Sequence, residues 1–140
     1  MTKVDFYFNA ADKLEVARKL AGKVYQSGRQ ALLYTADDRL ANALDAAIWT
    51  RDKLSFIPHL RCGHQQAKET PLLIGTDPDA LASPDVLINL DAECPSCFSR
   101  FERLLEVVGT DPADVQAGRQ RYRFYKDRGY AIENHDLAGK

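Results

Sequence analysis

The sequence lacks the features that mark secreted and membrane proteins. Its 140 residues include only three cysteines, an odd number, so the disulfide framework of a small secreted protein is not expected. No apolar run approaches the roughly 20 residues that a membrane helix needs. The first nine residues also lack the charged start and long apolar stretch of a signal peptide. These absences predict a cytoplasmic protein without membrane contact.

Glycine is missing where a nucleotide-binding fold needs it. After the first apolar run the chain reads Asn9-Ala10-Ala11-Asp12-Lys13, with no glycine to bring the backbone close to a pyrophosphate. The phosphate-loop pattern GxxxxGK[ST] does not occur either. We therefore expect neither a nucleotide nor another cofactor.

An excess of positive charge is also absent. The formal net charge is −1, whereas a protein that coats nucleic acid unaided usually presents a broad basic surface. Hydrophobic residues make up 45% and charged residues 28%, which are the values of a globular protein. No repeat, low-complexity tract or linker divides the chain, so a single domain covering residues 1–140 is predicted.

Short apolar runs alternate with segments of helical periodicity. Asp12 and Glu15 have capping-box spacing at the start of a helix that ends near Gly28, and Asp37 or Asp38 can cap a second helix. This order favours an α/β fold with parallel strands and right-handed crossovers. The predicted strands are Val4–Phe8, Ala31–Tyr34, Leu72–Ile74, Val86–Leu90 and a short edge strand at Tyr130–Glu133.

Two further helices are predicted in the C-terminal third. Phe98, Phe101, Leu105 and Val108 recur at helical intervals before Gly109 and indicate a third helix. The last helix is expected to begin after Asp111, with proline at its first position.

The cysteines and histidines form a pattern that could bind a metal. Cys62 and His64 form a CxH pair, and 29 residues separate them from the CxxC pair Cys94 and Cys97. These are zinc-ligand types, but a redox dithiol or buried structural thiols are alternatives, and the last is favoured. His59 and His64 flank a polar loop without an arranged nucleophile, so catalysis is not expected.

The stretch Ala113–Tyr130 is strongly basic and aromatic. Helical geometry places Ala113, Ala117 and Phe124 on one face, which is expected to pack inward. The opposite face holds Arg119, Tyr122, Arg123 and Lys126; Arg121 and Arg128 add to the positive charge, against the single acidic Asp127. A solvated face and an anionic binding site both fit this composition. The neighbouring tyrosine favours a carboxylate-bearing peptide or a nucleic acid as the ligand of such a site.

Trp49 is the only tryptophan and is followed by Phe56 in an irregular segment. Ordinary core packing explains such residues in many proteins. Aromatic side chains at the end of a helix also anchor protein interfaces, so both interpretations stay open.

Several of these segments, in this order, resemble the chi subunit family of bacterial DNA polymerase III. The resemblance spans nearly the whole chain, and the segment from Trp49 to Phe56-Ile57-Pro58-His59 is its most specific part. The matching segments are Val4-Asp5-Phe6-Tyr7, Leu44-Asp45-Ala46-Ala47-Ile48-Trp49, Ser55-Phe56-Ile57-Pro58-His59, Asp85-Val86-Leu87-Ile88-Asn89-Leu90, and Arg119-Gln120-Arg121-Tyr122-Arg123 before Gly129-Tyr130.

The resemblance implies a three-layer, Rossmann-like α/β/α fold with a mixed, mostly parallel sheet of about five strands and no nucleotide-binding loop. It also implies a non-catalytic subunit that links the psi subunit to the acidic C-terminal tail of single-stranded DNA-binding protein. By position, Trp49 and Phe56 match the psi-facing aromatic residues of the family. Arg119, Tyr122 and Arg123 match its tail-binding site, to which Lys126 is added here.

One departure concerns the basic face. Family members can carry a further basic residue about one turn before Arg119, where this chain has Val115 and Gln116. The alternative function is a small zinc-dependent nucleic-acid-processing enzyme that uses Cys62, His64, Cys94 and Cys97. Direct binding of single-stranded DNA by the basic helix is expected to be weak at most.

Overall fold

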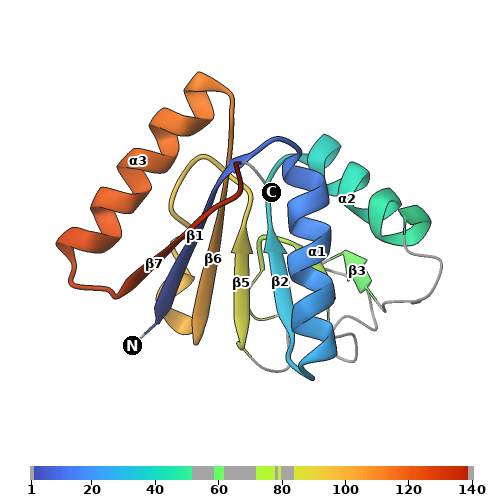
Figure 1. Ribbon diagram of the computed structural model, residues 1–140. Coiled ribbons are helices and arrows are strands. Elements are labelled where there is room, and N and C mark those ends of the chain that lie inside the picture. The colour runs from blue at the N-terminus through green and yellow to red at the C-terminus, as the bar shows by residue number, and fades with distance from the viewer. Residues whose placement is uncertain (1, 52–58, 62–71, 78, 80–83, 139–140) are drawn as a thin grey trace.

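The computed structural model describes residues 2–51, 59–61, 72–77, 79 and 84–138, with the backbone alone at 47–51 and 59–61 (Figure 1). Strands and helices alternate along most of the chain, as the sequence predicts. Their bounds are β1 (Lys3–Ala10), α1 (Lys13–Gln26), β2 (Ala31–Tyr34), α2 (Asp38–Arg51), β3 (His59–Arg61), β4 (Leu72–Gly75), β5 (Val86–Asn89), the 3₁₀ turn η3 (Phe98–Arg100), β6 (Arg103–Gly109), α3 (Pro112–Asp127) and β7 (Ile132–Asp136).

The strands form one sheet in the order β3-β4-β2-β5-β6-β1-β7, and each recorded pairing is parallel. The central strands β2, β4 and β5 are almost entirely apolar, as is typical of parallel strands covered on both faces. The predicted α/β class is therefore confirmed. The described sheet has seven strands where about five were expected, and it is parallel throughout where a mixed sheet was expected.

Two hydrophobic cores lie on opposite faces of this sheet. On one face, Leu20 of α1 and Leu44 of α2 pack against Leu33 of β2. On the other face, Tyr125 of α3 and Phe98 of η3 pack with aliphatic residues of the strands. The sheet is thus the middle of three layers, with α3 alongside β7, β1 and β6 and away from α1 and α2 (Figure 1).

The prediction of a third helix is wrong. Residues 98–100 form only a single 3₁₀ turn, and Arg103–Gly109 is strand β6, which is inserted between β5 and β1. The spacing of Phe98, Phe101, Leu105 and Val108 fits a helix, but Leu104 and Val107 are apolar as well. Both are fully buried, because a strand between two core layers buries successive side chains on opposite faces.

Helix α3 begins where the sequence predicts. Asp111 precedes Pro112 at the first helical position, although the Asp111 side chain accepts no capping hydrogen bond. Instead, the Asp114 carboxylate accepts a hydrogen bond from the Gly109 backbone at 2.6 Å and pairs with Lys13 at 3.2 Å. These contacts fix the start of α3 against the carboxyl end of β6 and the start of α1. Within the described residues, no helix is both long and apolar enough to cross a membrane.

Candidate functional site

A pocket of about 850 Å³ opens between α3 and strands β1, β6 and β7. Phe8 and Asn9 lie near the carboxyl end of β1, and Val108 and Gly109 end β6. The carboxyl ends of parallel strands are where open α/β sheets bind their ligands. The position of the pocket therefore fits a binding site.

One stripe of α3 forms the helical wall of the pocket. Val115, Arg119, Tyr122 and Lys126 follow each other at intervals of three or four residues and therefore lie on one helical face. The strands opposite contribute Phe6, Phe8 and Val108, and two asparagines, Asn9 and Asn134, also line the pocket. The pocket thus combines an apolar floor with a polar, mostly basic rim.

The Tyr122 ring is held by the sheet. It meets the buried Phe6 ring edge to face, with 5.2 Å between the ring centroids and an interplanar angle of 64°. Edge-to-face pairs of this kind are favourable beyond their buried area. Tyr122 is thus a fixed aromatic surface in the pocket wall.

The cations of the rim are available to a ligand. Arg119, Arg123 and Lys126 are exposed, and none forms an ion pair with another residue that the structure describes. Asp127 is the acidic residue of the lining. Three positive charges against one negative charge make the rim attractive to an anion.

The four residues predicted for an anionic site, Arg119, Tyr122, Arg123 and Lys126, therefore all line this pocket. The prediction of which face of α3 packs inward is wrong. Ala113 is exposed, and Ala117 and Phe124 are only partly buried.

The face of α3 that meets the sheet is instead Gly118, Arg121 and Tyr125, all of which are buried. The sequence counted Arg121 in the positive charge of this stretch without assigning it to either face, and in the structure only 2% of it is exposed. Around the helix, this buried face lies between the apolar face and the basic face that the sequence distinguishes. The reason is a carboxylate in the sheet.

Glu106 of β6 is that carboxylate, and it is fully buried. Its Oε1 accepts a hydrogen bond from Arg121 Nε at 2.9 Å, and its Oε2 accepts one from the Tyr125 hydroxyl at 2.5 Å. Asn89 of β5 donates to both oxygens, and Arg121 Nη1 donates to the Ala92 carbonyl at 2.7 Å.

The pKa values of this cluster follow from its burial. Burial raises the pKa of Glu106, and the Arg121 guanidinium and the Tyr125 and Asn89 donors oppose that rise. Burial and the neighbouring carboxylate raise the pKa of Tyr125 far above its usual range, so its hydroxyl keeps the proton that it donates. The cluster is an internal ion pair and takes no part in the exposed rim.

Gly118 allows an unusually close approach of helix and sheet. A Cβ atom at this position would lie 2.8 Å from Cγ2 of Val108, a distance that real Cβ contacts essentially never show. Both residues also line the pocket. The inner edge of the pocket is therefore the line along which α3 touches β6.

The residues predicted to face the psi subunit are only partly described. Trp49 lies in α2, but its side chain and all of Phe56 fall outside the part of the molecule that the structure describes. Their role in an interface stays a prediction.

The four possible zinc ligands are likewise only partly described. Cys62 and His64 fall outside the described residues, whereas Cys94 and Cys97 lie just before and at the start of η3. Cys97 is buried, and both thiols pack against the aromatic core beneath α3. Burial raises the pKa of both thiols, which disfavours the thiolate needed for metal binding or redox chemistry. These observations do not support the zinc enzyme.

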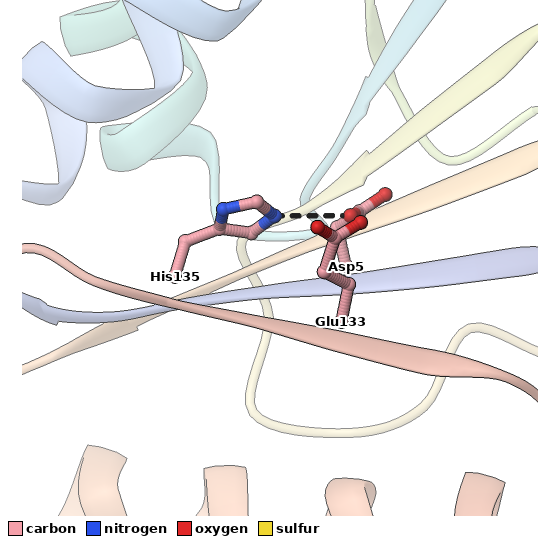
Figure 2. A group of neighbouring side chains, drawn as sticks. All are labelled: Asp5, Glu133 and His135. Atoms are coloured by element: carbon pink, nitrogen blue, oxygen red, sulfur yellow. Dashed lines mark hydrogen bonds and ion pairs between the residues drawn. The ribbon is translucent and has the colours of Figure 1, made fainter.

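Another group of possible metal ligands was not predicted from the sequence. Asp5 of β1 and Glu133 and His135 of β7 share one face of the sheet, with ligand atoms within 4.8 Å of one another (Figure 2). Protein cations already satisfy the two carboxylates. Arg103 Nη2 donates to Asp5 Oδ2 at 2.7 Å, and Lys3 pairs with Glu133 at 3.2 Å.

Asp5 is the buried member of this group, with 1% of its side chain exposed. His135 Nε2 lies 3.0 Å from its second oxygen. Burial alone would raise the pKa of Asp5, but the hydrogen bonds from Arg103 and His135 hold it below its ordinary value. The cluster is balanced without a metal, and it ties β7 to β1 behind the pocket.

The fold and the pocket define a Rossmann-like α/β protein with a basic and aromatic pocket at the carboxyl ends of its strands. The sequence profile of the family "DNA polymerase III chi subunit, HolC" matches residues 1–133. The chain belongs to this family and is accordingly a replication accessory subunit. The resemblance seen in the sequence is thereby confirmed.

Individual relatives agree with this assignment. The DNA polymerase III subunit chi of Pseudomonas aeruginosa is 37% identical over 141 residues, which cover 98% of each chain. The Haemophilus influenzae subunit chi is 28% identical over 88% of this chain and 86% of its own length. The Escherichia coli subunit chi is 27% identical over 81% of this chain and 78% of its own length.

Solved structures show the fold alone. The C-terminal domain of the DEAD-box protein Dbp5 superposes with a TM-score of 0.59 at 13% identity, covering 96% of this chain and 89% of that one. T4 UvsW superposes with a TM-score of 0.66 at 8% identity, covering 97% of this chain and 42% of that one.

Proposed function

We propose that this protein is a non-catalytic adaptor of DNA polymerase III, acting in the cytoplasm. In this proposal the pocket beneath α3 binds the acidic C-terminal tail of single-stranded DNA-binding protein, and a separate surface around Trp49 and Phe56 binds the psi subunit. The observation that carries the proposal is the composition of the pocket. Exposed cations without a described ion-pair partner stand beside an apolar floor.

The chemistry of such a tail fits both parts of the pocket. A peptide that is acidic and ends in an aromatic residue presents a carboxylate and an apolar group close together. Arg119 and Arg123 can donate bidentate hydrogen bonds to the carboxylate, as guanidinium groups do. Phe8 and Val115, which are partly exposed, offer an apolar surface for the aromatic side chain, and the buried Phe6 ring supports Tyr122 beside them. Val115 therefore adds apolar surface to the helical wall, where other members can carry a positive charge.

The energetics of the two parts differ. Each exposed cation of the rim is expected to contribute about 1 kcal/mol or less, because solvent screens it. Removal of the terminal aromatic side chain from water is expected to contribute about 1.5–3 kcal/mol. Affinity should consequently depend on the last residue of the peptide and weaken as salt increases.

The experiment is a titration of the protein with a synthetic peptide ending in Asp-Ile-Pro-Phe and with the same peptide lacking the final Phe, each at low and moderate salt. Micromolar binding that requires the final Phe and weakens with salt supports the proposal. Equal binding of the two peptides would contradict the apolar seat. Failure of both to bind would overturn the tail-binding function.

The two surfaces are separated by variants. Trp49→Ala and Phe56→Ala should weaken binding to a purified psi subunit and leave peptide affinity unchanged. Arg119→Ala should do the reverse. A variant that loses both partners together while it stays folded would contradict two independent surfaces.

A further inference from the structure

Helix α3 touches the sheet along one narrow line. Its buried residues Gly118, Arg121 and Tyr125 are spaced by three and four positions and lie on one face. The residues that line the pocket, among them Arg119 and Tyr122, are the immediate neighbours of this line on the helix. Because a helix is stiff over this length, the contact line determines how far these side chains stand from the sheet.

Two contacts on this line, one repulsive and one attractive, fix the distance of the helix from the sheet. At Gly118 the limit is repulsive, because the Cβ position already lies within 3 Å of Val108. At Arg121 the contact is attractive and directional, since Nε binds Glu106 of β6 while Nη1 binds the Ala92 carbonyl. The first contact sets the closest approach of α3, and the second holds the helix there.

A role in stability alone does not explain the ion pair. Replacing a buried ion pair by neutral groups of similar volume is often neutral or stabilising, since each buried charge loses its hydration. Arg121 Nη2 is also buried without a hydrogen-bond partner among the described residues, which adds to the cost of burying this side chain. What the pair does supply is a fixed geometry, because a planar guanidinium with two bound partners allows few helix positions.

We propose that Gly118 and the Arg121–Glu106 pair are positioning residues for the pocket. Together they set the distance between the α3 wall, with Arg119 and Tyr122, and the floor at Phe6. This inference rests on the proposed function, in which the ligand is an acidic peptide with an apolar end. Arg121 then acts on binding from behind the pocket and does not touch the peptide.

The first test is a cycle of Gly118→Ala, Val108→Ala and the double variant. The added methyl group pushes α3 outward without changing any charge, so peptide affinity should fall about tenfold, as overpacking contacts of this kind imply. Removing the Val108 branches makes room for the methyl group, so the double variant should bind within about threefold of Val108→Ala alone. Gln120→Ala, at an exposed position of α3 outside the pocket lining, is the matched control and should bind as the wild type does.

The second test uses Arg121→Met combined with Glu106→Gln, which removes both charges and leaves the net charge unchanged. Thermal unfolding establishes that this variant is folded. Its peptide affinity should fall, while the slope of log Kd against log salt stays at the wild-type value. Arg119→Ala should instead lower that slope, since it removes a rim charge.

Defined results overturn the inference. Wild-type affinity in a folded Gly118→Ala protein, or no recovery in the double variant, would show that the contact line does not set the pocket. A lower salt slope in the Arg121→Met, Glu106→Gln protein would show that Arg121 contacts the peptide directly.

A ligand-free measurement keeps this inference separate from the proposed function. The Phe6 and Tyr122 rings are in contact in the unliganded protein, and nuclear Overhauser effects between them should weaken in Gly118→Ala and return in the double variant. If the wild type binds no peptide, the proposed function fails, and these ring contacts still decide whether the contact line sets the pocket. Unchanged contacts in Gly118→Ala would overturn it.

Discussion

Arg121 and Arg123 lie two residues apart on α3 and have opposite environments. Arg121 is buried and binds Glu106, whereas Arg123 is exposed at the rim of the pocket and pairs with no described residue. The helix rotates by about 200° between them, so one points to the sheet and the other away from it. The residue type is the same, and the difference comes from the Glu106 carboxylate, which the sheet presents to Arg121 and not to Arg123.

The comparison shows why a charged helix face cannot be interpreted from the helix alone. The sheet presents a carboxylate beneath Arg121 and an aromatic floor beside Tyr122. A buried arginine needs the first, and a ligand with an apolar end needs the second. Variants that remove one arginine or the other should therefore separate stability from binding.

The largest expected effect comes from breaking the buried pair on one side only. Arg121→Ala leaves the Glu106 carboxylate buried and unpaired, which should lower the free energy of unfolding by about 3–5 kcal/mol. Arg123→Ala removes the same charge from the exposed rim and should change it by less than about 0.5 kcal/mol. Urea denaturation of both variants measures the two values. Similar losses would break the distinction between the two arginines.

The Asp5–Arg103 pair is intermediate between the buried Arg121–Glu106 pair and the exposed rim charges, because Asp5 is buried while Arg103 is partly exposed. Asp5→Asn should cost about 1–3 kcal/mol at neutral pH, as expected when charge-assisted hydrogen bonds to a buried group are lost. Glu133→Gln, which removes the exposed pair with Lys3, should cost less than about 1 kcal/mol.

The Asp5 contribution should also depend on pH. The pKa of Asp5 is lower in the folded protein than its ordinary value of 3.8, so the ionised carboxylate favours the folded state. Its contribution is complete well above pH 3.8 and is lost as the pH falls through the folded-state pKa. Urea denaturation of the wild type and Asp5→Asn between pH 7 and about pH 2 should show the difference shrinking in acid. A constant difference would contradict this assignment.

At the rim, Arg119→Ala should weaken binding of the acidic peptide about three- to tenfold and reduce its salt dependence, without a change in stability. Arg39→Ala removes an exposed charge from α2, outside the pocket, and is the matched control. Isothermal titration at two salt concentrations measures both. An equal loss in the control would mean that only the overall charge of the protein matters.

The sequence predicts the α/β class well because its strands are short apolar runs that a parallel sheet requires. It fails at β6, where the apolar run Leu104–Val108 is interrupted by Glu106 and also matches helical spacing. The two valines and the terminal Gly109 were signals for a strand. A buried glutamate in a strand makes sense only once Arg121 is known to lie above it.

The site is predictable only in part, because the sequence shows local periodicity but not which elements pack together. The helical stripe with Arg119, Tyr122 and Lys126 follows from local periodicity alone. The floor at Phe6 and Phe8 does not, because it depends on β1 lying between β6 and β7 and on α3 crossing that side of the sheet. The alternation of these two phenylalanines along the first strand was the available signal that they share a face.

The smallest predicted effect concerns the acidic residue of the rim. Asp127 lines the pocket beside Lys126 and should repel an acidic peptide, so Asp127→Asn is expected to tighten peptide binding about twofold at low salt. The gain should disappear at high salt, because both the charge and its ligand are solvated. Glu93→Gln makes the same change of charge at an exposed position outside the pocket lining and should leave affinity unchanged. If Asp127→Asn instead weakened binding, Asp127 would be holding a rim cation in position for the peptide. The exposed side of the helix would then depend on a carboxylate–cation pair, as its buried side does.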